Sequence, residues 1–214
     1  MTTTGGAARR GFLALGDSYT IGEGVAEAGR WPVQLVAILR ARGIAIDDPR
    51  IIAKTGWTTD ELDAGIDAAH SIAPIPDDHA LVSLLVGVNN QYRGRSLAEY
   101  ETQFAGLLER AVGYAGGEAG RVIVLAIPDW GVTPFAMQSG RDRAQIAAQL
   151  DAFNAAAQRI TRVRGAGFID TAVVSRERGG EAPMLADDGL HPSGALYALW
   201  AAAAASRGWP ADGH

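Results

Sequence analysis

The sequence contains no cysteine among its 214 residues. Disulfide bonds, thiolate nucleophiles, iron–sulfur clusters and zinc–thiolate sites are therefore excluded. Lysine is almost absent as well, because Lys54 is the only one and arginine supplies nearly all of the positive charge. A biased genome composition explains this shortage as readily as any function does, so it indicates nothing about activity.

Long apolar runs are also missing. No run reaches the roughly 18 residues that span a bilayer, and the alanines at 201–205 are too few and too weakly hydrophobic. The N-terminal sequence MTTTGGAARRG has two arginines but lacks the apolar core of a signal peptide. The net charge of -5 disfavours a general attraction to nucleic acid or anionic lipid. We therefore expect a cytoplasmic protein without nucleic-acid or membrane partners, and its oligomeric state stays open.

Short apolar segments alternate with longer amphipathic ones along the chain. Strands are expected at 11–15, 50–54, 80–87, 121–127 and 167–170, and helices at about 31–42, 59–71, 96–115, 140–164 and 193–206. Most of the strands are apolar at consecutive positions, which is typical of a parallel sheet covered on both faces. The pattern predicts an α/β fold, a three-layer α/β/α sandwich of about five parallel strands that is flavodoxin-like. We expect one domain over 1–214, with a core of about 11–206.

In such a fold, ligands bind beyond the carboxyl ends of the strands. The segment after the first strand, GDSYT, offers Ser18 as a nucleophile, and TGWTT after the second offers the N–H of Gly56. GVNN after the third strand offers the Asn89 side chain, and ADDGLHPSG places Asp188 three residues before His191. A hydroxyl, a histidine base and an orienting carboxylate are the parts of a serine hydrolase. Ser18 N–H, Gly56 and Asn89 are candidate oxyanion-hole donors.

Each segment alone also has an ordinary structural interpretation. Gly-Asp-Ser at a strand end is more often a turn or a helix cap, and DGLHPS could be a turn before a helix. Asp67 and His70 repeat the Asp-x-x-His spacing, and we interpret them as a surface pair near a helix end. His79 precedes a strand and His214 is the last residue, so only His191 is well placed.

The four segments in this order resemble the SGNH (GDSL-type) hydrolase superfamily, whose conserved blocks carry Ser, Gly, Asn and His. The resemblance spans about residues 11 to 206. It implies that Ser18 is the nucleophile and first oxyanion donor, that Gly56 and Asn89 are the other donors, and that His191 is the base with Asp188 as its partner.

The sequence departs from this family's pattern at two positions. Tyr19 stands where the common pattern has leucine, and Asn90 stands where the family usually has aspartate. The aspartate is usually taken as structural, so the change at Asn90 bears on loop geometry more than on catalysis. Tyr19 is expected either to face the acyl pocket or to pack.

The resemblance implies an ester hydrolase that forms an acyl-serine intermediate. We expect carboxylic esters of short-to-medium acyl chains as substrates, with carbohydrate O-acetylesterase, lysophospholipase and thioesterase activities as alternatives within the family. Five apolar side chains flank the predicted site loops and are candidates for an acyl pocket, although core packing explains them equally well: Tyr19, Trp57, Tyr92, Trp130 and Leu190. The long segment 128–140 is a candidate for the rim of that pocket.

Other interpretations remain open at this point. Arg93 and Arg95 would meet an anionic leaving group or, as we favour, are surface arginines. A flavodoxin-like phosphate- or nucleotide-binding module would wrap GDSYTIGEG around the anion, but Asp17 and Glu23 would repel it and no G-K-[ST] is present. An inactive scaffold would leave the set of Ser, Asp and His unexplained. A metal-dependent hydrolase needs more ligands than one well-placed histidine, so we expect no metal and no cofactor.

Overall fold

The structure is a computed structural model that describes residues 10–207. One sheet of five parallel strands lies at its centre, in the order β2-β1-β3-β4-β5. The strands are β1 (Phe12–Gly16), β2 (Pro49–Ala53), β3 (Leu81–Leu85), β4 (Val122–Leu125) and β5 (Gly167–Ile169). Each lies within a few residues of its expected position. The expected α/β fold, with a flavodoxin-like order of five parallel strands, is therefore confirmed.

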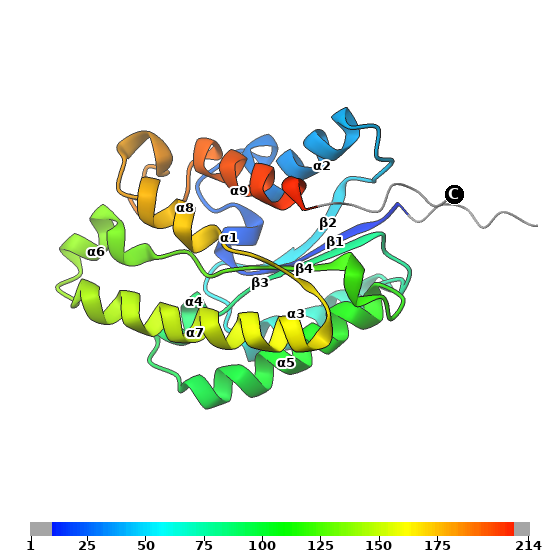
Figure 1. The fold of residues 1–214 in the computed structure, drawn as a ribbon, viewed down its shortest axis with the longest axis horizontal. Helices are drawn as coiled ribbons and strands as arrows, with labels where there is room; N and C mark the ends of the chain where they lie inside the picture. The colour runs from blue at the N-terminus through cyan, green and yellow to red at the C-terminus, as the bar shows by residue number, and fades with distance from the viewer. Residues whose placement is uncertain (1–9, 208–214) are drawn as a thin grey trace, which may run out of the picture.

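Helices cover both faces of the sheet (Figure 1). The helices α2 (Trp31–Ala41) and α9 (Gly194–Ser206) pack side by side on one face. The other face carries α3 (Thr59–Ile72), α5 (Leu97–Tyr114) and α7 (Arg143–Arg164). All five correspond to expected helices. An apolar stripe at helical spacing marks α2, α3, α5 and α7, whereas α9 is apolar nearly all round.

Shorter helices were not expected from the sequence. They are α1 (Ser18–Ile21), α4 (Val88–Tyr92), α6 (Pro134–Gln138) and α8 (Thr171–Arg178), together with the 3-10 turns η1 (Glu27–Gly29), η2 (Ala119–Arg121), η3 (Trp130–Val132) and η4 (Ala182–Met184). One or two turns hold too few residues to show a periodic pattern. Three of these helices, α1, α4 and α6, contribute residues to the site described below.

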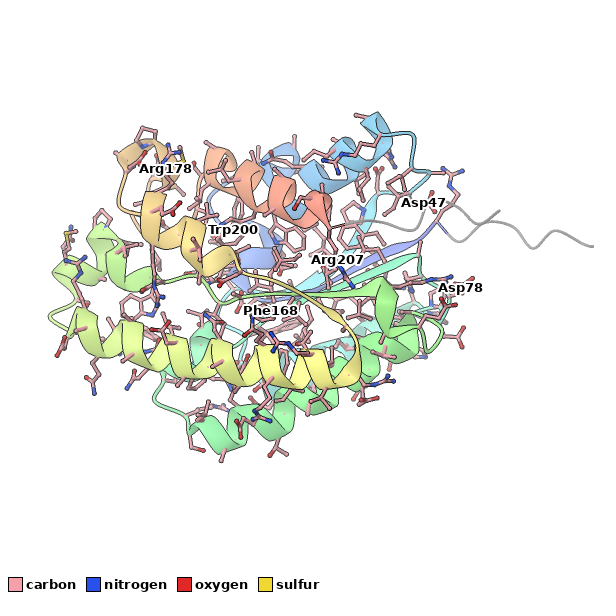
Figure 2. The ribbon with its side chains drawn as sticks, viewed as in Figure 1. Asp47, Asp78, Phe168, Arg178, Trp200 and Arg207 are labelled. Carbon is pink, nitrogen blue, oxygen red and sulfur yellow. The ribbon has the colours of Figure 1, made fainter. Side chains whose placement is uncertain are left out.

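The core lies between the sheet and its two helical layers. Every residue of β1 and β3 is buried, whereas β2 at the edge of the sheet is mostly only partly buried. This explains why the central strands are apolar at consecutive positions. On the face covered by α2 and α9, Trp200 of α9 is completely buried and points toward the sheet (Figure 2).

The two ends of the sheet carry different residues. Asp47 and Asp78 precede β2 and β3, so they mark the amino edge, and Arg178 of α8 lies at the opposite end of the molecule (Figure 2). At the amino edge, His79 Nδ1 lies 3.1 Å from the carbonyl oxygen of Tyr114. The carboxyl ends of β1, β2 and β3 therefore meet away from His79, at the end where α1 and α4 begin.

The prediction that Asp67 and His70 pair with each other is wrong. Asp67 instead accepts a hydrogen bond from Arg110 Nη2 at 2.6 Å, and His70 Nδ1 accepts one from the Ile75 N–H at 3.3 Å. Each side chain has a nearer partner outside its own helix. His214 lies outside the described residues, and the expectation of a single domain over 1–214 stays a prediction.

Among the helices between residues 10 and 207, none is both long enough and apolar enough to cross a bilayer.

Candidate active site

Ser18 is placed by a tight turn at the end of β1. A Cβ on Gly16 would lie 2.2 Å from Thr20 Oγ1 and 2.4 Å from the Leu85 carbonyl oxygen, so only glycine fits there. Asp17 then caps α1, because its Oδ1 accepts a hydrogen bond from the Tyr19 N–H at 3.0 Å. Ser18 is the first residue of that helix and stands at the carboxyl edge of the sheet.

His191 is fixed by Asp188 in one short loop. Asp188 Oδ1 accepts hydrogen bonds from the N–H groups of Leu190 and His191, both at 2.9 Å, and Oδ2 lies 2.5 Å from His191 Nδ1. Partial burial acts to raise the pKa of Asp188, but these hydrogen bonds together outweigh it and hold that pKa below its usual value. An ionised carboxylate only accepts hydrogen bonds, so His191 Nδ1 carries the proton. His191 Nε2 is then free to accept one.

The Ser18 N–H and two further candidate donors, from Gly56 and Asn89, belong to the same site. Gly56 follows β2 with a φ of +88°, which glycine adopts without strain. Asn89 lies in α4, and its Nδ2 donates to the Trp57 carbonyl at 2.9 Å, which leaves its second hydrogen available. Within the described part of the chain, neither the N–H of Ser18 nor that of Gly56 makes a hydrogen bond. The site therefore offers two backbone donors and one side-chain donor.

One cavity of about 230 Å³ brings these groups together. Its lining residues are Ser18, Tyr19, Thr55, Gly56, Val88, Asn89, Tyr92, Trp130, Phe135, Leu190 and His191. The structure thus collects the candidate nucleophile, the candidate base and all three candidate donors around one space. Asp188 stands behind His191, on the side of Nδ1.

The walls of the cavity are largely apolar and aromatic. Tyr92 meets Trp130 edge to face with their ring centroids 5.4 Å apart, and Trp130 meets Phe135 in the same way at 6.1 Å. Trp130 lies 2 % exposed, and its Nε1–H donates to Gln91 Oε1 at 2.9 Å. Because its polar atom has a partner, Trp130 can face the cavity with the rest of its ring.

Four of the five expected pocket residues line this cavity, and Trp57 does not. Its indole instead covers Gly65 of α3, where a Cβ would lie only 2.1 Å from Trp57 Cη2. The placement of Trp57 in the pocket was therefore wrong: the absence of a side chain at Gly65 offers the indole a flat surface on the helix. Sequence reasoning also missed Thr55, Val88 and Phe135, although Phe135 belongs to the segment 128–140 that was expected to form a rim.

Tyr19 lies between the cavity and the interior. Its ring centroid is 5.6 Å from that of His191 and 6.0 Å from that of Trp200. Burial, with a contribution from nearby carboxylates, raises the pKa of Tyr19, so the phenol is neutral. With Trp130 and Leu190, Tyr19 also lines a second, much smaller cavity of about 10 Å³. These three side chains therefore separate the two spaces.

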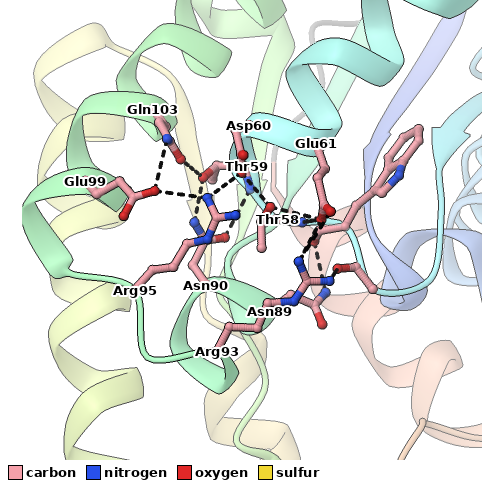
Figure 3. Close-up of polar contacts among 12 residues, drawn as sticks. Thr58, Thr59, Asp60, Glu61, Asn89, Asn90, Arg93, Arg95, Glu99 and Gln103 are labelled. Atoms are coloured by element: carbon pink, nitrogen blue, oxygen red, sulfur yellow. Dashed lines mark hydrogen bonds and ion pairs between the residues drawn. The ribbon is translucent and has the colours of Figure 1, made fainter.

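Arg93 and Arg95 lie beside the Asn89 segment in a network of polar contacts (Figure 3). Arg93 pairs with Glu61 at 3.2 Å, and Arg95 pairs with Asp60 at 2.7 Å. Neither arginine is among the residues that line the cavity. The interpretation that they contact a leaving group is therefore not supported by their position.

Between residues 10 and 207, no three histidine, cysteine, aspartate or glutamate side chains are grouped so that they could hold a metal ion.

Several solved structures share this fold. The lipase/acylhydrolase from Enterococcus faecalis has a TM-score of 0.65 and 20 % identity, with 92 % of this chain and 93 % of that chain covered. The esterase EstA from Pseudoalteromonas sp., inhibited by monoethylphosphonate, has a TM-score of 0.65 and 16 % identity over 91 % and 94 % of the two chains. The acetylxylan esterase Axe2 from Geobacillus stearothermophilus has a TM-score of 0.66 and 21 % identity over 97 % and 98 %. The architecture is the α/β fold of the SGNH hydrolases.

The family can be assigned from the sequence profile that matches this chain. Residues 14–199 match the GDSL-like lipase/acylhydrolase family, and no curated protein matches. The chain belongs to the GDSL-like lipase/acylhydrolase family, and it is accordingly a hydrolase of ester bonds.

Proposed function

We propose that this protein is a serine esterase that hydrolyses small carboxylic esters with short-to-medium acyl chains. One observation carries the proposal: Ser18, His191 and the three hydrogen-bond donors line a single cavity whose other walls are mostly apolar. Such a cavity gives an ester both a reactive end and an apolar place for its acyl chain. A cytoplasmic location, and the absence of nucleic-acid and membrane partners, stay predictions from the sequence.

The reaction begins with the attack of Ser18 Oγ on the ester carbonyl carbon. A serine hydroxyl is a weak nucleophile until a base accepts its proton. In the proposed mechanism, His191 Nε2 accepts that proton while the new C–O bond forms. Asp188 holds the Nδ1–H of the ring and stabilises the imidazolium that results.

The attack places negative charge on the carbonyl oxygen. The N–H groups of Ser18 and Gly56 and the free Nδ2 hydrogen of Asn89 are the proposed donors to that oxygen. Removing one such donor typically raises the barrier by about 3 kcal/mol. Ser18, Gly56 and Asn89 all line the cavity, which supports a mechanism in which the donors need little reorganisation as the charge develops.

The intermediate then collapses in two stages. The bond to the leaving alcohol breaks, and His191 returns its proton to the alkoxide, so that the acyl group stays on Ser18 Oγ. A water molecule next gives a proton to His191 and attacks the acyl carbon. The carboxylic acid leaves, and Ser18 recovers its proton from His191.

An acetylesterase is the second candidate. The acetylxylan esterase Axe2 aligns over 97 % of this chain, which supports acetyl esters of carbohydrates as an alternative. Against it, Tyr92, Trp130 and Phe135 provide more apolar surface than an acetyl group needs. Nitrophenyl acetate, butanoate, hexanoate and octanoate share one leaving group, so the ranking of their kcat/KM values decides between the two candidates.

The serine mechanism is tested with the same esters on the wild type and on Ser18→Ala. Turnover should fall by at least about 10³-fold, because the covalent route is removed. A fluorophosphonate probe should label the wild type and leave Ser18→Ala unlabelled. Ester turnover that survives in Ser18→Ala would overturn the mechanism. A wild type that neither turns over esters nor reacts with the probe would support the phosphate-binding alternative.

A further inference from the structure

The conformation of the loop that carries Gly56 depends on hydrogen bonds from side chains outside the loop. Gly56 has no Cβ and a φ of +88°, so its own side chain cannot limit its backbone conformation. The position that a Cβ would occupy is nearly empty: apart from the adjacent residues of the chain, the one atom of the described residues within 4 Å of it is Arg93 Nη2 at 3.6 Å. The direction of the Gly56 N–H must therefore be set by hydrogen bonds to neighbouring peptide groups.

Successive peptide groups of this loop are held by three side chains (Figure 3). Arg93 Nη2 donates to the Gly56 carbonyl at 2.7 Å, and Asn89 Nδ2 donates to the Trp57 carbonyl at 2.9 Å. The Thr58 N–H donates to Glu61 Oε2 at 2.9 Å as part of the capping box of α3. The Trp57 N–H closes a turn onto the Lys54 carbonyl at 3.2 Å, so every peptide N–H and C=O from the Gly56 carbonyl to the Thr58 N–H has a partner.

Arg93 and Asn89 act from the same side of α4. Asn89 lies in the first turn of α4 and Arg93 is the C-cap residue four positions later, so their side chains reach consecutive carbonyls of the loop from one side. Glu61 fixes the guanidinium from the other side, because Arg93 Nη1 lies 3.2 Å from Glu61 Oε2. One carboxylate thus holds both Thr58 and Arg93.

We propose that Arg93 is a positioning residue of the oxyanion hole. By holding the Gly56 carbonyl it fixes the peptide group that follows Gly56, whose N–H closes the turn onto Lys54, and this turn limits the direction of the Gly56 N–H in the preceding peptide group. The inference rests on the proposed esterase function. Arg93 does not line the cavity, so it acts through Gly56 and does not contact the substrate. It also joins the two loops that supply Gly56 and Asn89 into one unit.

Stability alone does not account for this arrangement. The side chains of Arg93 and Glu61 are 43 % and 39 % exposed, and ion pairs with such exposure contribute little to folding. A hydrogen bond to the Gly56 carbonyl has a different consequence, because together with the turn from Trp57 N–H to Lys54 it restricts the backbone torsions of Gly56, and so the direction of its N–H. Loss of Arg93 is therefore expected to change turnover far more than the unfolding midpoint.

Arg95 supplies a matched control. It lies two residues further along the chain. It pairs with Asp60 of α3 at 2.7 Å and with Glu99 of α5 at 3.0 Å. Among the described residues it donates to neither the Gly56 nor the Trp57 carbonyl. Arg95→Ala therefore removes an arginine of the same kind from the same surface while leaving the loop contacts in place.

The experiment compares Arg93→Ala, Arg93→Lys and Arg95→Ala with the wild type on nitrophenyl butanoate. In Arg93→Ala we expect kcat to fall by about 10- to 100-fold, less than the loss of a whole oxyanion donor, with KM changed less than about threefold. Lysine keeps one charged donor and should restore part of kcat. Free guanidinium ion at non-denaturing concentration should raise kcat of Arg93→Ala and not that of Arg95→Ala.

A second measurement does not depend on turnover. The NMR order parameter of the Gly56 amide should fall from about 0.85, typical of rigid backbone, to below about 0.6 in Arg93→Ala and stay unchanged in Arg95→Ala. An unchanged order parameter with unchanged kcat in Arg93→Ala would overturn the inference. The proposed function has its own test, because it is overturned if Ser18→Ala keeps the activity of the wild type. In that case the order parameter of the Gly56 amide still decides whether Arg93 holds the loop.

Discussion

Asn90 and Thr59 are joined by two hydrogen bonds that run in opposite directions. Asn90 Nδ2 donates to Thr59 Oγ1 at 2.7 Å, and the Thr59 N–H donates to Asn90 Oδ1 at 3.1 Å. Thr59 Oγ1 gives its own proton to Gln103 Oε1 (Figure 3). Both Asn90 and Thr59 are fully buried. The amide at position 90 therefore ties α4 to the start of α3 by donating and accepting at once.

An aspartate at position 90 is expected to destabilise the protein. A carboxylate accepts but cannot donate, so the hydroxyl proton of Thr59 would have to leave Gln103 and turn to the new side chain. We expect Asn90→Asp to lower the free energy of unfolding by about 1–3 kcal/mol, and Asn90→Ala by at least as much, since buried partners are left unsatisfied. Urea unfolding measures both. An Asn90→Asp variant as stable as the wild type would show that the network adapts to a carboxylate.

Asp188→Asn should impair catalysis although it keeps a side chain of the same size beside His191. An asparagine can present its amide hydrogens to His191 Nδ1, which favours the wrong tautomer of the ring. A loss of kcat of about 10²- to 10⁴-fold is expected. The neighbouring Asp187 is exposed and provides the control, because Asp187→Asn should leave kcat within about twofold. Equal losses in both variants would mean that the loss reflects disturbance of the loop and not of the tautomer.

Asp17 should make stability depend on pH. Burial raises the pKa of Asp17 to about 7 against the opposing hydrogen bond from the Tyr19 N–H, and Asp17 Oδ2 makes no hydrogen bond within residues 10–207. Between about pH 4 and pH 7 the unfolded state releases this proton while the folded state keeps it, so the stability contributed by Asp17 declines by at most about 1.4 kcal/mol per pH unit. Below pH 4 both states are protonated, and above pH 7 the loss is complete.

Asp17→Asn removes this titration. The free energy of unfolding of the variant, relative to the wild type, should therefore rise from pH 4 to pH 7 and then level off. Comparing the two proteins cancels the other carboxyl groups, whose titrations they share. Chemical unfolding at a series of pH values measures the difference. A difference that stays constant with pH would contradict a raised pKa for Asp17.

Tyr19 should limit the length of the acyl chain. Its ring lies between the cavity at Ser18 and the smaller cavity behind it, which Tyr19, Trp130 and Leu190 also line. Tyr19→Leu shortens this wall, and each further buried methylene contributes about 0.8 kcal/mol, or roughly fourfold in kcat/KM. The ratio of kcat/KM for octanoate over butanoate esters should rise about tenfold. Tyr19→Phe keeps the ring and should leave the ratio unchanged; an unchanged ratio in Tyr19→Leu as well would exclude Tyr19 as the limiting wall.

The sheet and the long helices could be predicted from the sequence because their patterns are local. The consecutive apolar residues of β1 and β3 reflect burial on both faces, and the stripe of α7 repeats over several turns. The positions of Ser18, Gly56 and Asn89 followed from the rule that parallel strands end at one edge. Short helices such as α1 and α4 gave no comparable pattern.

Contacts between distant segments were beyond what the sequence pattern could predict. Trp57 stands next to Gly56 in the chain, yet its indole turns to Gly65 on α3. Phe135 was reached only as part of a long loop, because nothing in its own neighbourhood indicates that it faces Trp130. The contact of Arg93 with Gly56 joins two loops through side-chain geometry. Such side-chain contacts depend on how the helices and strands pack against one another, which no local sequence pattern shows.

The order of the site residues along the chain has a consequence during synthesis of the protein. Ribosomes make Ser18 first, then Gly56 and Asn89, and His191 last, and the helix that follows His191 packs beside α2 from the early part of the chain. Domains tend to fold from the N-terminus during translation. A growing chain thus carries Ser18 for most of its elongation without His191, the base of the proposed mechanism. Under that mechanism we expect ester hydrolysis only after α9 has packed against the finished sheet, and turnover of a test ester would time that last folding step.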